Sequence, residues 1–132
     1  MSPEPSSLCP MHAQLRGIYS PDVADLDLAE FQPPDPECFS LNVGAYIGPS
    51  EPPLGEELFQ FTVLTAAWFV SHPPPKGFEF LRGTILLTRW HFPTIERAIG
   101  DLCLHAEGTT WEEVARKLNQ YGLWEFDDYR AG

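Results

Sequence analysis

The spacing of apolar residues changes at Pro93, and this change constrains the fold more than any other feature of the chain. Before Pro93, apolar and polar side chains alternate, most clearly in "CFSLNVGAYI" (38–47). Alternation of this kind predicts a strand with one buried face. After Pro93, apolar residues recur at the spacing of one helix face. Strands first and helices last predict an α+β fold, in which helices cover one face of a sheet.

Three further runs have strand-like composition, at 11–18, 57–69 and 83–92. Prolines cluster in the stretches between the runs, and proline ends regular structure because it cannot donate to a ladder. We therefore expect an antiparallel sheet of about four strands.

Two helices are predicted to pack on one face of this sheet. Pro93 suits the first turn of the first helix, and Gly108 is a candidate C-terminal cap. The run 109–113 contains two overlapping capping boxes, either of which would begin the second helix. Gly122 is expected to end that helix in a left-handed turn.

The predicted domain organisation is simple. Residues 1–10 are rich in Pro, Ser and Glu, which predicts a disordered tail, and they lack the basic and apolar regions of a secretory signal. Residues 11–132 are expected to form a single domain, and no apolar run is long enough for a transmembrane helix. The widely spaced Cys9, Cys38 and Cys103 predict reduced thiols, and hence a cytoplasmic protein.

Charge is distributed unevenly along the chain. The net charge is −11, and residues 1–60 hold ten acids and one base, Arg16, for a net charge of −9. Such a field repels nucleic acids and anionic membranes, because both bind through Lys and Arg. It attracts a basic protein surface and accelerates its encounter. The alternative is that the acids serve only solubility.

The acidic segment 20–37 and the loop 48–57 are the candidate docking surfaces. Long loops in small domains are often functional. A connector anchored to the sheet by apolar residues is the alternative for segment 20–37. The candidate partner-binding residues, including one near the C-terminus, are Asp22, Asp25, Asp27, Glu30, Asp35, Glu37, Glu51, Glu56 and Glu125.

Catalytic patterns are weak by comparison. The sequence contains no phosphate-binding glycine loop and no Gly-x-Ser-x-Gly motif. Glu112 and Glu113 suit a helix N-terminus without any acid–base role. No Cys and His residues cluster as zinc ligands, and 22–30 lacks the spacing of a calcium loop. We therefore expect no enzyme, no cofactor and no metal; a small hydrolase that uses His91 as a base is the alternative.

Four blocks of sequence, in this order, resemble the pattern of a known family. "LRGIYSPDV" (15–23), "AYIGP" (45–49), "FQFTVLTAAWF" (59–69) and "TWEEVARKLNQYGLWEFDDY" (110–129) resemble the immunity protein 8 family. Residues 1–10 and the Pro-rich loop 71–77 depart from its pattern. The signature positions of the family correspond here to Gly17, Tyr19, Ser20, Pro21, Asp22, Ile47, Gly48, Pro49, Phe61, Thr62, Val63, Trp68, Trp111, Leu118, Gly122, Trp124, Glu125, Phe126 and Tyr129.

The resemblance implies a protein encoded beside a bacterial polymorphic toxin, which protects the producer by binding and neutralising that toxin. An acidic inhibitor suits a basic toxin, for example a nuclease. No nucleic acid or membrane partner is expected, and the oligomeric state stays open. The alternative is an adaptor domain that binds another protein with no toxin involved.

The closing block "GLWEFDDY" (122–129) is predicted to be structural. Trp124 and Phe126 alternate with Glu125 and Asp127, so both rings can face the core while both acids point outward. Glu125, held between two anchored rings, is expected either to bind a partner or to satisfy the backbone of the chain itself.

Overall fold

The strand predicted at 38–47 lies at the centre of the sheet as β2 (Ser40–Pro49). The computed structural model describes residues 11–23, 26–51 and 55–125. In β2, Leu41, Val43, Ala45 and Ile47 are buried while Asn42 and Tyr46 are exposed, as the alternation predicts. Each buried β2 side chain thus points to the same face of the sheet.

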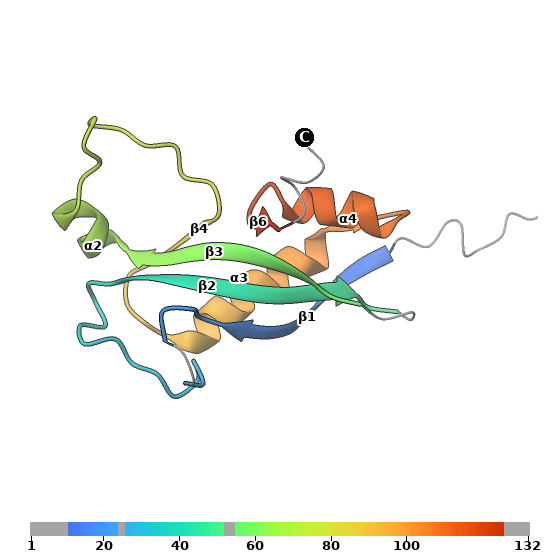
Figure 1. The fold of residues 1–132 in the computed structure, drawn as a ribbon, viewed down its shortest axis with the longest axis horizontal. Coiled ribbons are helices and arrows are strands. Elements are labelled where there is room, and N and C mark those ends of the chain that lie inside the picture. Colours follow the sequence, from blue (N-terminus) through green and yellow to red (C-terminus); the bar gives the residue numbers. More distant parts are fainter. Residues whose placement is uncertain (1–10, 24–25, 52–54, 126–132) are drawn as a thin grey trace, which may run out of the picture.

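Five more strands complete the sheet (Figure 1). They are β1 (Met11–Tyr19), β3 (Glu57–Thr65), β4 (Thr84–Leu87), β5 (Glu107–Gly108) and β6 (Leu123–Trp124). Their order is β4-β3-β2-β1-β5, and β6 pairs with β3. The neighbours β1, β2 and β3 are antiparallel, whereas β4 runs parallel to β3.

Two helices close the core on one face of the sheet. In α3 (Phe92–His105), Ile95, Ile99 and Cys103 are buried, and in α4 (Trp111–Leu118), Val114, Ala115 and Leu118 are buried. All of these side chains belong to one apolar cluster with β2 and β3, and α3 crosses behind the strands in Figure 1. The predicted α+β class and its two C-terminal helices are confirmed.

The parallel strand β4 is a departure from the expected antiparallel order, and α2 (Ala66–Ser71) explains it. The strand predicted over 57–69 ends at Thr65, whose hydroxyl accepts the Trp68 N–H at 3.3 Å and caps α2. The helix and the following loop then carry the chain back, so that β4 enters the sheet in the direction of β3.

Two glycines have roles other than those predicted. Gly108 lies in β5 opposite Met11, and α3 ends earlier, with Ala106 as its C-cap. Gly122 does not have positive φ; instead, a Cβ there would lie 2.5 Å from the Phe61 ring. Both expectations treated a glycine as a turn residue, whereas tertiary contacts require its small size.

The closing block is structural as far as it is described. Trp124 is 4% exposed and stacks on Phe59, with ring centroids 6.2 Å apart. The indole N–H of Trp124 donates to Glu57, and that of Trp111 donates to the second oxygen of the same carboxylate. Phe126 and Asp127 lie outside the described residues, as do residues 1–10. Within the described ranges, no helix is both long and apolar enough to cross a membrane.

Candidate partner-binding surface

The face of the sheet opposite α3 and α4 carries a stacked pair of tyrosines. The rings of Tyr19 and Tyr46 lie 5.4 Å apart at an interplanar angle of 24°. In the β1–β2 register, Tyr19 is opposite Gly44 and Tyr46 is opposite Gly17. Because each ring meets a glycine on the neighbouring strand, both rings can lie flat on the sheet and contact each other.

Negative charge borders this tyrosine pair. Burial raises the pKa of the Tyr19 phenol, and Tyr46 and the Glu125 carboxylate raise it further. Both effects favour the neutral phenol, which can donate one hydrogen bond and accept others. Glu125 is itself fixed, since its Oε1 accepts the Leu58 backbone N–H at 2.9 Å. Of the two predicted roles for Glu125, the backbone contact is therefore present.

Asp22 is held at the end of the same face. Its Oδ2 accepts the backbone N–H of Asn42 at 2.8 Å and the Asn42 side-chain amide at 3.2 Å. The Ser20 hydroxyl donates to the Asn42 carbonyl at 2.5 Å and accepts the Asp22 N–H at 3.1 Å. These contacts extend the β1–β2 pairing beyond Tyr19, so Asp22 has a fixed position next to Asn42.

The other candidate acids are arranged differently. Asp27 and Asp35 each accept a backbone N–H two residues ahead, from Ala29 and Glu37, at 3.0 Å. These are Asx turns, which hold the connector in shape. Glu37 also lies 3.8 Å from Arg89, as an exposed ion pair. The contacts of Asp27, Asp35 and Glu37 therefore lie within the connector or at its border.

Three candidate acids face solvent without a fixed contact. The described part of the chain gives no hydrogen bond or ion pair to the side chains of Glu30, Glu51 or Glu56, and all three residues are exposed. Asp25 lies outside the described residues. The structure thus places Glu125 beside the tyrosine pair and Asp22 at the end of the same face, whereas the other described candidates lie in the connector and the β2–β3 turn.

Sequence reasoning missed Tyr19, Tyr46 and Glu57 as partner-binding candidates. The alternation in β2 gives Tyr46 an outward direction, but only the register shows that it meets Tyr19. The signal available in the sequence was a tyrosine and a glycine in each strand, at 17 and 19 and at 44 and 46. Glu57 gave no signal, because its two indole partners are more than fifty positions away.

The residues considered for catalysis have structural contacts. His91 precedes α3, is exposed, and has its Nδ1 2.9 Å from the Thr94 hydroxyl. Among the described residues, His91 lines neither the pocket that includes Tyr121 nor the one that includes Ser40.

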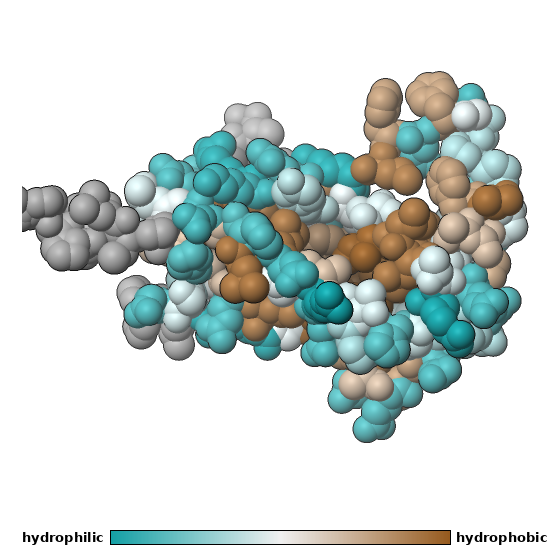
Figure 2. Space-filling model, turned by 180° about the vertical axis from the view of Figure 1, so that it is seen from behind, coloured by the Kyte–Doolittle hydropathy of each residue, from teal (hydrophilic) through white to brown (hydrophobic). Residues whose placement is uncertain are grey.

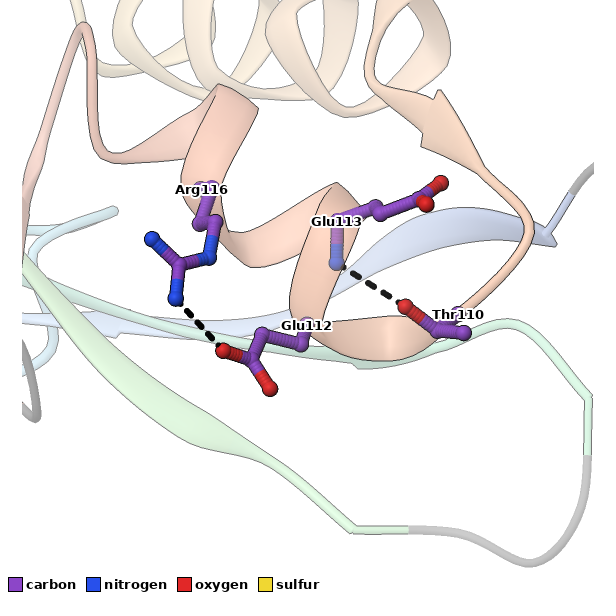
Figure 3. Close-up of polar contacts among 4 residues, drawn as sticks. All are labelled: Thr110, Glu112, Glu113 and Arg116. Carbon is purple, nitrogen blue, oxygen red and sulfur yellow. Dashed lines mark hydrogen bonds and ion pairs between the residues drawn. The ribbon is translucent and has the colours of Figure 1, made fainter.

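Glu112 and Glu113 stabilise α4. The Thr110 hydroxyl accepts the Glu113 N–H at 3.2 Å, and Glu112 forms an ion pair with Arg116 at 2.7 Å (Figure 3). The Glu113 carboxylate accepts the Thr109 N–H at 2.8 Å. The predicted capping box is therefore present, with Thr109 rather than Thr110 as the backbone donor to Glu113.

Two observations concern metal-ligating side chains and thiols. Among the described residues, no group of three His, Cys, Asp or Glu side chains is placed to hold a metal ion. Burial raises the pKa of the Cys103 thiol to about 11, which keeps it protonated and weakly nucleophilic at neutral pH.

One comparison with known proteins is informative. The sequence model of a family described as immunity protein 8 matches residues 13–129, nearly the whole chain. No curated protein and no solved structure matches.

Proposed function

The chain belongs to the immunity protein 8 family, and from this premise we propose that its acidic N-terminal half docks on a basic surface of the cognate toxin, with the tyrosine pair at the centre of the contact. Membership of the family implies an immunity protein against a polymorphic toxin. The protein acts by binding, without turnover. Its reduced thiols suit a cytoplasmic site of action.

The observation that carries this proposal is the combination of an acidic N-terminal half with two carboxylates of fixed position on the face of the tyrosine pair. Residues 1–60 have a net charge of −9. The Glu125 carboxylate borders the tyrosine pair, the Asp22 carboxylate lies at the end of the same face, and backbone hydrogen bonds fix both. Each carboxylate still has lone pairs to offer to Arg or Lys of a partner. Little side-chain entropy is lost when such groups bind.

Tyr19 and Tyr46 supply the anchor that charge alone lacks. Tyrosines at the centre of an interface often contribute a large share of the binding energy. Their rings also attract an Arg or Lys placed over the ring face, an interaction worth about 0.5–2 kcal/mol. A toxin that handles nucleic acid has such residues in its substrate site, so a nuclease is the toxin class that this face fits best.

Co-expression with the toxin encoded next to the gene tests the function. The two proteins should co-purify, and toxicity should disappear. Failure of the toxin to bind would favour an adaptor role with another partner.

Matched charge variants test the docking surface. We compare two double variants. The first carries Glu30→Gln and Glu56→Gln, and the control carries Glu96→Gln and Glu107→Gln. All four side chains are exposed, and each variant removes two negative charges. Association with the toxin should slow, and its salt dependence should decrease, only in the first variant. Identical association rates for both variants at every salt concentration would exclude acidic docking.

A further inference from the structure

Apolar side chains are exposed on the loop before β4 and on β4 itself. Phe80 is 93% exposed and Leu86 is 63% exposed, and Phe78 and Leu81 are also open to solvent. Figure 2 shows apolar residues gathered toward the end of the molecule that carries this loop. Such a patch on a monomer commonly marks a contact with another molecule.

A groove with a volume of about 800 Å³ runs beside β4. Ile85 from β4 and Ile99 and Leu102 from α3 line its apolar part. The groove lies between β4 and the helices α3 and α4, and residues of all three elements line it.

Among the described strands, none pairs with the edge of β4 that faces away from β3. The Thr62 N–H donates to the Gly83 carbonyl at 2.7 Å, and Thr62 is aligned with Thr84 in the parallel register. In a parallel ladder, alternate residues bond to the same neighbour, so Ile85 bonds to β3. Thr84 and Leu86 therefore turn their N–H and C=O groups outward, toward the side on which a further strand would lie.

The rim of the groove has a charge opposite to that of the whole molecule. Arg82 and Lys117 line it, and Asp101 is its only acid, in a chain of net charge −11. Within the described residues Arg82 has no acidic partner, whereas Arg89 and Arg116 each form an ion pair. The Arg82 guanidinium can therefore bind a carboxylate of another molecule.

We propose that β4 receives an extended segment of a partner protein as an added strand, with alternate apolar side chains in the groove and a carboxylate beside Arg82. Main-chain bonds to Thr84 and Leu86 provide the affinity, and the apolar groove and the basic rim select the sequence. This surface lies at a sheet edge, apart from the tyrosine pair, and the inference does not depend on the identity of the toxin.

The test is selection of random twelve-residue peptides displayed on phage, using the full chain as bait. Of the backbone hydrogen-bonding groups of β4, Leu86→Pro removes only an outward-facing N–H, a loss that a strand at a sheet edge tolerates. Leu86→Ala is the control, because it shortens the same side chain and keeps the N–H. Selected peptides should alternate apolar residues and include an acid. They should bind Leu86→Pro at least about tenfold more weakly than Leu86→Ala, a difference of about 1.4 kcal/mol.

Other outcomes overturn the inference. These are failure to select any peptide, equal binding by the two variants, or selection of peptides whose affinity is unchanged by Arg82→Gln. A dimer that Leu86→Pro dissociates, with no peptide selected, would assign the edge to a second copy of the chain. If Leu86→Pro does not fold, hydrogen exchange of the wild-type protein decides: a selected peptide must slow exchange at Thr84 and Leu86, and unchanged exchange at both refutes strand addition.

Discussion

The ring of Tyr19 lies on the backbone of Gly44, so closely that a Cβ built on Gly44 would be 2.3 Å from Tyr19 Cε1. Gly44→Ala must therefore displace the ring and break the tyrosine pair. We expect a loss of about 1–3 kcal/mol in the free energy of unfolding, typical of an overpacked contact. Toxin binding should weaken as well. Chemical denaturation and calorimetric titration measure the two effects.

Gly17→Ala is the matched control for that experiment. A Cβ on Gly17 would lie 4.0 Å from Tyr46 Cδ2, which is an ordinary contact. The variant should bind the toxin almost as well as the wild type. Equal loss of toxin binding in both glycine variants would show that the geometry of the tyrosine pair does not determine the affinity.

Trp124 and Glu125 are neighbours whose substitution should have opposite consequences. Trp124→Ala empties a site that is 4% exposed and removes the stacking on Phe59, at a cost of about 3–5 kcal/mol in stability. Glu125→Gln keeps an oxygen that can accept the Leu58 N–H but removes the charge, so melting should change little while toxin affinity falls. Normal melting of Trp124→Ala with lost binding would reverse the assignment.

Alanine substitutions at Gly122 and Gly100 test whether contact with a neighbouring side chain requires a glycine at position 122. A Cβ on Gly122 would meet the Phe61 ring at 2.5 Å, whereas one on Gly100, within α3, would have no atom within 4 Å. Gly122→Ala should lower the melting temperature. Gly100→Ala should raise stability by about 0.5–1 kcal/mol, because alanine favours helix. A stabilising Gly122→Ala would contradict the packing described here.

Glu113 should make stability depend on pH. The backbone N–H and the hydroxyl of Thr109 hold the pKa of this carboxyl below its usual range. Because the folded-state pKa is the lower one, the ionised group stabilises the protein above the ordinary glutamate pKa. That contribution is lost as pH falls through the folded-state pKa. The difference in melting temperature between wild type and Glu113→Gln should therefore shrink on acidification. A difference that stays constant would argue against a stabilising role of the ionised Glu113.

Cys103 should be unreactive while the protein is folded. Its thiol is buried, and burial raises its pKa to about 11, so almost no thiolate is present at neutral pH. In a Cys9→Ser, Cys38→Ser double variant, a thiol reagent should react with Cys103 only after denaturant is added. Rapid reaction of the folded variant would show that α3 opens readily.

Much of the fold was predictable because its signals are local. The alternation in β2, the helical spacing after Pro93 and the capping box at α4 each depend on residues within a few positions of one another. The direction of β4 was not predictable, because it depends on α2, and Thr65 looks like any strand residue until its hydroxyl is seen to cap that helix.

The candidate surface was predictable only in part, for the same reason. The excess of acids in the first 60 residues is a property of composition, but it does not tell which carboxylates are rigid. Asp22 is fixed by Asn42, twenty positions away, and Glu125 by Leu58, 67 positions away. Both contacts depend on how strands align, which no local pattern encodes.

The sequence by itself determined the class of fold, the family and the sign of the charge, since these depend on composition, spacing and the order of blocks along the chain. The tertiary structure decided which residues meet. Sheet register sets Tyr19 on Gly44 and against Tyr46, and among the described strands it leaves the outer edge of β4 unpaired. Register is set by cooperative packing of whole strands, so contacts between distant residues emerge only when the chain is folded.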